Sequence, residues 1–373
     1  MDKRVMLAVA GAGKTYYICH AIDKEKRNLI LAYTHENINN IVKELIDAHG
    51  SVPKRTTVMT FDSFLYRCLV CPYEPTIGEF FGRQGFKSKG ITMKEPPKQT
   101  KQAGKRHIPN PLYKKKSELE HYITGDGRYY CSRLAELILN IKKGKESLIK
   151  RLIGRLNLFY DQIMIDEFQD FREHDYDLII ELSKALNSIV LVGDYYQHSV
   201  SAVNNSGKPF KKRSREMSYS DFVNELKTLK FEVDETTLRK SRRCSGNVCA
   251  FVKDKLEIDI ESEGVHEGRV KWIAENELDE FLSNKEITKL VYSGAHNYSF
   301  DALNWSYSKG DTLESACVIL TDGLENLDGD DFSVTKISLI TRNKLYVALT
   351  RSKGDLYLIK ASQFKKYKNR YMD

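Results

Sequence analysis

The sequence predicts an α/β protein in which parallel β-sheets are flanked by helices. Short apolar runs of strand length alternate with helical patterns along most of the chain, and this alternation is typical of a parallel sheet. The chain has 373 residues, of which 41% are hydrophobic, and this content suffices for ordinary globular cores. At about 100–200 residues per domain, the length predicts two or three domains.

The elements fall into two sets, which we assign to domains at residues 1–232 and 233–373. In the first set, the expected strands are 5–10, 29–33, 162–165 and 189–192, and the expected helices are 14–24, 37–48 and 174–186. In the second set, the expected strands are 231–233, 269–273, 289–292, 316–320 and 356–360, and the expected helices are 247–255 and 341–348.

A region at about residues 72–125 interrupts the first domain. It holds six of the eight prolines, and between residues 83 and 116 it has eleven Lys or Arg and one acidic residue. We interpret it as a small basic insertion. It is either a solvated loop or a surface that follows a nucleic-acid backbone, and in the second case the candidate contacts are Lys114, Lys115 and Lys116.

A phosphate-binding loop is predicted between the first strand and the first helix, where the sequence reads AVAGAGKT from Ala8 to Thr15. Glycines permit the backbone to curl around phosphates, and the amides at a helix start point at an anion. Lys14 supplies charge to the outer phosphates, and Thr15 offers a hydroxyl to Mg²⁺. The expected cofactor is ATP with Mg²⁺. The candidate nucleotide-binding residues are Ala10, Gly11, Ala12, Gly13, Lys14 and Thr15.

Two further motifs follow apolar strands. Ligands of an open α/β sheet lie outside the carboxyl ends of its strands, so both motifs are expected to meet the phosphate loop. In the first, Asp166 suits Mg²⁺ ligation, and Glu167 suits orienting and deprotonating the attacking water. In the second, Gln197 suits a hydrogen bond to the γ-phosphate. Arg242 and Arg243 precede a helical pattern, where they are either solvated or stabilise charge on a transferring phosphoryl group.

In this order the motifs resemble those of superfamily 1 helicases of the UvrD/Rep/PcrA type, and the resemblance spans the whole chain. The DEFQD, GDYYQ and VALTR segments, which end at Asp170, Gln197 and Arg351, are close to the family's DExQD, GDxxQ and VALTR motifs. LAYT ending at Thr34, TFDSF starting at Thr60 and YSKG ending at Gly310 are similar to motif Ia, TFHSF and SAKG.

The resemblance implies two RecA-like domains with ATP between them. It implies catalytic roles for Lys14, Glu167, Gln197, Arg243 and Arg351, the last two as arginine fingers from the second domain. It also implies nucleotide contacts for Arg242 and Gly310. Contacts to a single DNA strand are implied for Tyr33, Thr34, Thr60 and Phe61, with Tyr33 stacking on a base.

Several positions depart from the family pattern. Asp62 replaces a DNA-contacting histidine, and Thr312 stands where motif V has a glutamate. We expect the large accessory subdomain to be absent or vestigial, because roughly sixty residues separate Arg243 from motif V. We also expect the family's upstream adenine-reading segment to be missing, which leaves the base selectivity open.

The expected function is that of an ATP-dependent single-stranded DNA translocase or helicase. The alternative is a DNA-stimulated ATPase that senses DNA and regulates a nuclease partner, as small UvrD-like proteins accompany OLD-family nucleases in anti-phage systems of the Gabija type. The expected partner is single-stranded or partly duplex DNA, which fits a net charge of +8. We expect no membrane partner and a cytoplasmic location, because no apolar stretch approaches the ~20 residues of a bilayer span and no signal peptide is seen.

Overall fold

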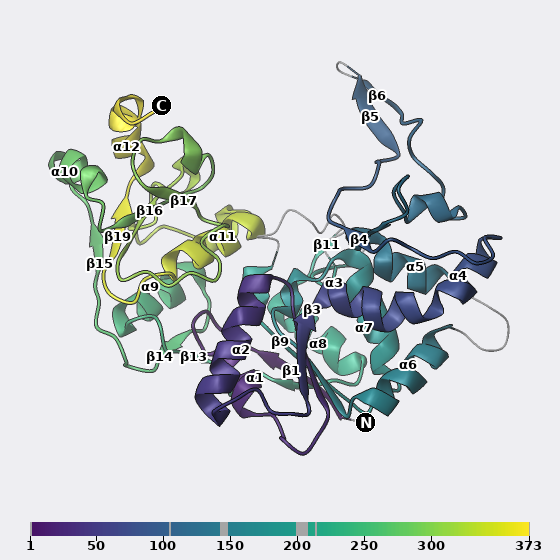
Figure 1. Ribbon diagram of the computed structural model, residues 1–373. Coiled ribbons are helices and arrows are strands. Elements are labelled where there is room, and N and C mark those ends of the chain that lie inside the picture. The colour runs from purple at the N-terminus through teal and green to yellow at the C-terminus, as the bar shows by residue number, and fades with distance from the viewer. Residues whose placement is uncertain (1, 104–105, 142–147, 199–207, 213–214, 373) are drawn as a thin grey trace. The chain divides into compact units, whose positions relative to one another are not determined.

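The computed structural model describes residues 2–103, 106–141, 148–198, 208–212 and 215–372 (Figure 1). Its contacts divide the chain into two compact units. The first unit comprises Met1–Val5, Thr15–Leu191 and Val203–Glu232, and the second comprises Met6–Lys14, Val192–Ala202 and Val233–Asp373. The domain boundary between residues 232 and 233 stays a prediction.

A six-stranded sheet carries the first set of motifs. Its strands, in spatial order, are β12 (Glu232–Asp234), β1 (Asp2–Leu7), β9 (Ser188–Gly193), β8 (Gln162–Ile165), β2 (Asn28–Ala32) and β3 (Thr56–Thr60). The pairs β2–β3, β2–β8 and β8–β9 are parallel. All five residues of β2 are buried, as expected of a central strand covered on both faces.

Helices flank this sheet (Figure 1). They are α1 (Lys14–His20), α2 (His35–His49), α3 (Phe61–Phe64), α4 (Glu74–Phe80), α5 (Leu134–Asn140), α6 (Leu148–Phe159), α7 (Glu173–Ser183) and α8 (Tyr219–Thr228). The sequence sets the limits of α2 clearly. At the start of α2, the Thr34 side chain accepts a hydrogen bond from the Asn37 N–H at 3.1 Å. At the end of α2, Gly50 adopts a left-handed backbone with a φ of 77°.

The basic insertion contains short strands. β4 (Ile91–Thr92) pairs in parallel with β7 (Tyr129–Tyr130), and β5 (Thr100–Ala103) pairs antiparallel with β6 (Arg106–Pro109). Residues 104–105, at the turn of the second pair, lie outside the described residues. A third short pair is formed by β10 (Lys211–Lys212) and β11 (Arg215–Glu216).

The second unit contains a five-stranded sheet whose pairs are all parallel. Its strands, in spatial order, are β15 (Val270–Trp272), β19 (Leu356–Ile359), β18 (Ala316–Ile319), β16 (Thr288–Val291) and β17 (Ala302–Asn304). Its helices are α9 (Gly246–Leu256), α10 (Leu278–Ser283), α11 (Leu339–Leu349) and α12 (Ala361–Tyr367), and β13 (Lys240–Ser241) pairs with β14 (Glu261–Ser262).

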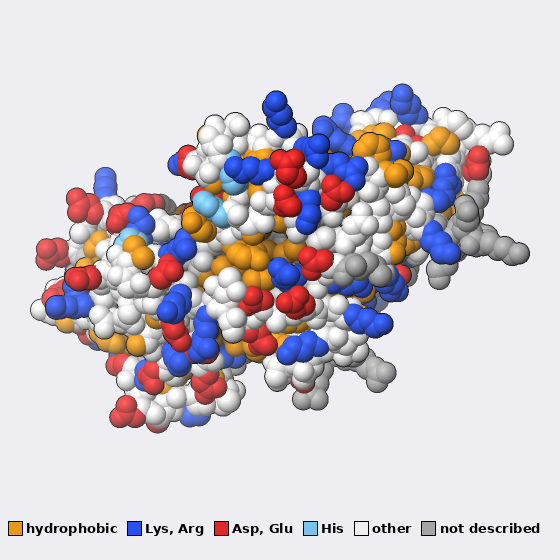
Figure 2. Space-filling model, turned by 90° about the horizontal axis from the view of Figure 1, so that it is seen from below, with side chains coloured by type: hydrophobic (Ala, Val, Ile, Leu, Met, Phe, Trp, Pro, Cys, Tyr) orange, Lys and Arg blue, Asp and Glu red, His pale blue; other side chains and the backbone are white. Residues whose placement is uncertain are grey.

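The predicted α/β class with parallel sheets flanked by helices is confirmed. One strand belongs elsewhere than expected. The strand predicted at residues 231–233 and grouped with the second set is β12 (Glu232–Asp234), which lies at the edge of the six-stranded sheet. No helix in the described part of the chain has the length and apolar character of a bilayer span. On the face in Figure 2, Lys and Arg side chains are interspersed with Asp and Glu.

Candidate nucleotide and nucleic-acid sites

The predicted phosphate loop connects β1 to α1, which begins at Lys14. Gly11 and Gly13 have φ angles of 72° and 81°, a backbone conformation that glycine adopts without steric cost. A Cβ atom at Gly11 would lie 2.6 Å from Cβ of Arg243 and 2.7 Å from Oγ of Ser241. The loop therefore keeps the curled, side-chain-free backbone that phosphate binding requires.

Backbone hydrogen bonds within the second unit hold this loop. The N–H of Ala8 donates to the Gly193 carbonyl at 2.8 Å, and the N–H of Val9 donates to the Leu238 carbonyl at 3.0 Å. The Gly11 carbonyl accepts the Arg242 N–H at 2.9 Å. The loop is thus fixed directly to the segment that carries the predicted arginines.

A buried network centred on Tyr346 also holds the loop. The Tyr346 hydroxyl accepts the Ala10 N–H at 2.7 Å and donates to Oδ2 of Asp194 at 3.2 Å. The same Asp194 oxygen accepts Nε2 of Gln197 at 2.9 Å. Burial raises the pKa of Tyr346 well above 10.0, so the hydroxyl keeps the proton that it donates. Gln197 thereby connects to the phosphate loop through two intervening side chains.

The predicted magnesium ligands lie together. Oγ1 of Thr15, in the first turn of α1, is 3.3 Å from Oδ2 of Asp166, which follows β8. Asp166 is 2% exposed, and its other oxygen accepts the Glu167 N–H at 2.9 Å. A hydroxyl and a carboxylate at the end of a buried strand are hard oxygen donors, which suit Mg²⁺. The described residues contain no cluster of three His, Cys, Asp or Glu able to hold a metal.

Glu167 has a left-handed backbone, with a φ of 55°. This conformation is uncommon for a residue other than glycine, and such residues gather at functional sites. The Gln169 side chain donates to the Glu167 carboxylate and limits its freedom.

The two predicted finger arginines differ in their surroundings. Arg243 is half-buried; its Nε donates to Oγ1 of Thr312 at 2.9 Å and its guanidinium to the Thr350 carbonyl at 3.2 Å. Arg351 is 1% exposed and donates to the carbonyls of Val347 at 2.8 Å and Ser308 at 3.2 Å. Burial lowers the pKa of Arg351 to about 9, so it is still charged at neutral pH. As placed, Arg351 braces its own unit.

The two other predicted nucleotide contacts are on the surface. The exposed Arg242 side chain forms an ion pair with Glu263 at 2.8 Å. Gly310 is exposed, with a φ of 97°.

The predicted aromatic DNA contacts lie in a hydrophobic cluster. Phe61 is fully buried, so its side chain packs in the core rather than facing a ligand. The Tyr33 ring stacks on Phe61 with centroids 5.3 Å apart and meets the edge of Phe171 at 6.0 Å. The buried Tyr33 hydroxyl has no hydrogen-bond partner among the described residues.

The polar DNA contacts have structural roles of their own. Thr34 begins α2, and the Thr60 side chain begins α3 by accepting the Ser63 N–H at 3.2 Å. Asp62 forms an ion pair with Arg172 at 2.5 Å, and Arg172 also contacts Asp175 at 2.7 Å.

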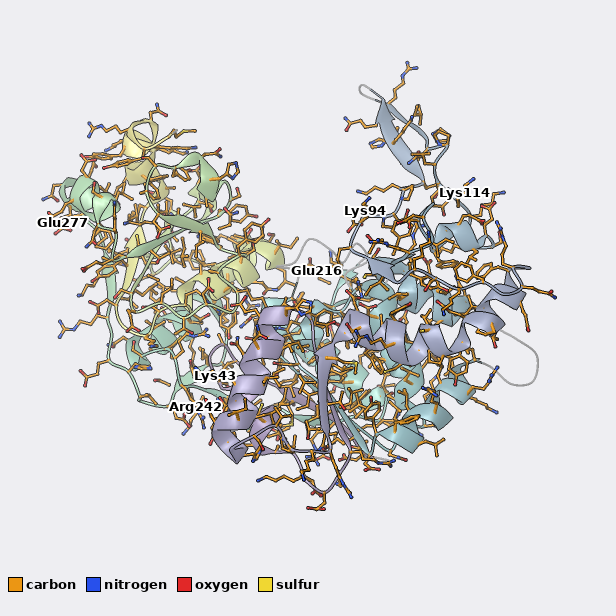
Figure 3. The ribbon with its side chains drawn as sticks, viewed as in Figure 1. Lys43, Lys94, Lys114, Glu216, Arg242 and Glu277 are labelled. Atoms are coloured by element: carbon orange, nitrogen blue, oxygen red, sulfur yellow. The ribbon has the colours of Figure 1, made fainter. Side chains whose placement is uncertain are left out.

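The three insertion lysines are all exposed, but they are not equivalent. Lys116 forms an ion pair with the Glu136 carboxylate, whereas the ammonium groups of Lys114 and Lys115 form no ion pair among the described residues. The backbone N–H of Lys115 donates to the Glu118 carboxylate at 2.8 Å. Lys114 is labelled in Figure 3, near the foot of the β5–β6 hairpin.

Sequence reasoning gave no role to Tyr346 or Arg172. Tyr346 directly precedes the VALTR segment, and this position next to a motif was the sequence feature that could have drawn attention to it. Only the fold shows that its hydroxyl contacts Ala10. No sequence signal paired Arg172 with Asp62, which lies 110 positions away.

Comparison with known proteins gives one family match. Residues 85–199 match the UvrD/REP helicase N-terminal domain, and this stretch contains Asp166, Glu167 and Gln197. The match covers less than a third of the chain. It supports a relationship of this stretch to the UvrD/REP helicases. No curated protein matches the chain.

Two solved viral helicases share similarity with the chain. The PRRSV helicase matches 99% of the chain at 13% identity with a TM-score of 0.44, and the chain covers 54% of that protein. The arterivirus nonstructural protein 10 helicase, solved in a complex with DNA, matches 95% of the chain at 12% identity with a TM-score of 0.42, and the chain covers 60% of that protein. Both TM-scores are below 0.5, so no functional conclusion is drawn from these likenesses.

Proposed function

We propose that this chain hydrolyses ATP to ADP and phosphate and uses the cycle to move along single-stranded DNA as a UvrD-like translocase or helicase. The observation that carries the proposal is the approach of the Thr15 hydroxyl to the buried Asp166 carboxylate, with Glu167 adjacent. A phosphate loop alone indicates binding, whereas this carboxylate pair beside it supplies the groups that hydrolysis needs.

Each residue has a distinct task in this proposal. The backbone of Gly11 and Gly13 and the charge of Lys14 bind the phosphates. Thr15 and Asp166 would hold Mg²⁺, which when bound neutralises phosphate charge. Glu167 orients a water molecule and accepts its proton.

Arg243 is the better placed of the two arginines to stabilise phosphoryl charge. It lies directly against the phosphate loop, and its side chain is only half-buried. The contacts of Arg351 would have to break before its guanidinium reached a phosphate. We therefore assign the charge-stabilising role to Arg243 and a bracing role to Arg351.

One observation favours the alternative of a DNA-sensing ATPase that regulates a nuclease partner. Asp62 stands where the family has a DNA-contacting histidine, and the ion pair with Arg172 fixes its carboxylate. In the proposed enzyme, this part of the DNA path would therefore differ from that of the family. The support for a nuclease partner and an anti-phage role comes only from the resemblance of the sequence to small UvrD-like proteins.

Substitutions at Lys14 and Glu167 test the proposed chemistry. Lys14→Ala is expected to abolish ATP hydrolysis, because the outer phosphates lose their cation. Glu167→Gln is expected to bind ATP normally but to hydrolyse it about 10²–10⁴-fold more slowly, because the amide cannot accept a proton. Lys24→Ala removes an exposed lysine from the same region and serves as the matched control. Wild-type turnover by Lys14→Ala would refute the loop assignment, and loss of ATP binding in Glu167→Gln would refute the role of the base.

A further inference from the structure

The insertion presents an isolated two-stranded hairpin. Among the described residues, β5 and β6 pair only with each other, with Lys101 opposite Ile108 and Gln102 opposite His107. The β6 side chains are all exposed, and the hairpin stands out from the rest of its unit (Figure 1). A lone two-stranded ribbon is marginally stable in water, so a ribbon exposed on both faces is suited to a partner that covers it.

The charge of the hairpin specifies a polyanion. Residues 96–117 contain seven Lys or Arg and no acidic residue. Lys98, Lys101 and Arg106 are exposed and have no acidic partner among the described residues. Lys94 and Lys114 lie near the foot of the hairpin and extend the same charge (Figure 3). Elsewhere, exposed lysines such as Lys253 and Lys366 are held in ion pairs with Asp259 and Glu275.

The composition of the hairpin argues against a single strand as the partner. Proteins bind single strands by stacking bases on aromatic side chains, each worth about 1–3 kcal/mol. Residues 98–110 contain no Phe, Tyr or Trp. The register instead places Lys101, Ile108 and Arg106 on one face of the ribbon, and Gln102 and His107 on the other. The one aromatic ring in residues 98–110 is the imidazole of His107, which offers a smaller stacking surface than Phe, Tyr or Trp.

The shape of the hairpin matches one groove of duplex DNA. The major groove of B-DNA is about 12 Å wide and admits a two-stranded β-ribbon. The major groove of A-form RNA is too deep and narrow for side chains to read. We propose that the β5–β6 hairpin lies in the major groove of duplex DNA, with Lys98, Lys101 and Arg106 on the phosphates. This inference rests on the proposed function and adds to it the duplex part of the substrate.

Binding measured by fluorescence anisotropy tests the inference without nucleotide hydrolysis. The probes are a blunt DNA duplex, a single strand of the same length, and an RNA duplex of the same sequence. In the double variant Lys101→Ala/Arg106→Ala, we expect weaker duplex binding. The plot of the logarithm of its binding constant against the logarithm of the salt concentration should have a slope shallower by about 1.8. The reason is that each phosphate contact contributes about 0.9 to the slope, and the variant removes two contacts. Single-strand binding should change little. The matched control, Lys253→Ala/Lys366→Ala, removes two cations elsewhere and should retain the wild-type slope.

Three outcomes would overturn the inference. They are an unchanged duplex slope, an equal loss of single-strand binding, and tighter binding of the wild-type protein to the RNA duplex than to the DNA duplex. Failure of the proposed function is separate, because it appears as absent ATP hydrolysis by the wild-type protein. The two substitutions alter exposed side chains only, and a circular dichroism spectrum like that of the wild type shows that both variants fold.

Discussion

The Tyr346 side chain holds the phosphate loop, together with the backbone hydrogen bonds of that loop. Its hydroxyl accepts the hydrogen bond of the Ala10 amide and also donates to Asp194, which in turn accepts a hydrogen bond from Gln197. Hydrogen bonds thus connect the loop to Gln197 through Tyr346 and Asp194. We infer that Tyr346 is a positioning residue for the proposed site.

Replacing Tyr346 by Phe tests this role. The ring still fills the core, but the buried Ala10 amide loses its acceptor, at a cost of about 1–3 kcal/mol in the free energy of unfolding. We also expect a lower rate of ATP hydrolysis, because Asp194 and Gln197 lose a fixed neighbour. Urea unfolding and steady-state kinetics measure the two effects. Tyr307→Phe, at a residue 76% exposed, is the control and should change stability little. Unchanged stability and turnover in Tyr346→Phe would show that the network is dispensable.

The residues of the candidate site divide into those that sequence could place and those that it could not. The meeting of Thr15 and Asp166 was predictable, because both follow from the rule that strand ends converge at one edge of a parallel sheet. Arg351 illustrates the limit. The VALTR motif identifies the arginine, but its burial against the carbonyls of Val347 and Ser308 depends on segments that only the fold brings together.

At the scale of elements, Glu136 on α5 connects the insertion to the helical layer of its unit. Its carboxylate is 7% exposed and contacts His121 at 3.2 Å, His174 on α7 at 3.4 Å, and Lys116. Burial alone raises the pKa of Glu136, but these hydrogen bonds outweigh it and hold the pKa well below its usual 4.5.

This arrangement predicts a dependence of stability on pH. A carboxyl group whose pKa is lower in the folded chain stabilises the fold fully above its unfolded pKa, and this contribution is lost as the pH falls below it. We expect the free energy of unfolding of the wild-type protein to decrease as the pH falls below about 4.5. In Glu136→Gln this decrease should be smaller, and the free energy of unfolding at neutral pH should be lower than that of the wild type by about 2 kcal/mol. Urea unfolding across the pH range measures it. Glu95→Gln, at an exposed position, should follow the wild-type profile; an unchanged profile in Glu136→Gln would refute the assignment.

Strands were more predictable than the elements around them. The strand predicted at 162–165 is β8 without change, because a buried central strand is a continuous apolar run with clear ends. The helices that were missed are α3, α4, α5, α6, α8, α10 and α12. The strands β3 and β17 of the two sheets were missed as well, and so was the β5–β6 hairpin. The hairpin is exposed on β6 throughout, so no burial pattern marks it in the sequence. Strand β12 was assigned to the wrong set, because pairing partners at a sheet edge are a tertiary property.

At the scale of the whole molecule, the arrangement of charge matters more than its sum. The net charge is +8, yet the face in Figure 2 mixes both signs, and the acid-free run lies in the insertion. A mixed surface attracts DNA weakly, whereas a concentrated basic segment binds it with a strong dependence on salt. The proposed enzyme would thus use the insertion to hold DNA while the phosphate loop and Glu167 turn over ATP.

Movement along DNA separates the two functional alternatives. A translocase that advances with each hydrolysis cycle pushes streptavidin from the biotinylated end of a single strand, whereas a stationary sensor hydrolyses ATP without doing so. We expect the wild-type protein and Lys24→Ala to accelerate streptavidin loss from one end in the presence of ATP. Glu167→Gln should bind the strand without displacing streptavidin, because the cycle stops before hydrolysis. DNA-stimulated hydrolysis with no displacement from either end would contradict translocation. The ion pair of Asp62 with Arg172 would then be the first feature to revert, by Asp62→His, in a search for the lost coupling.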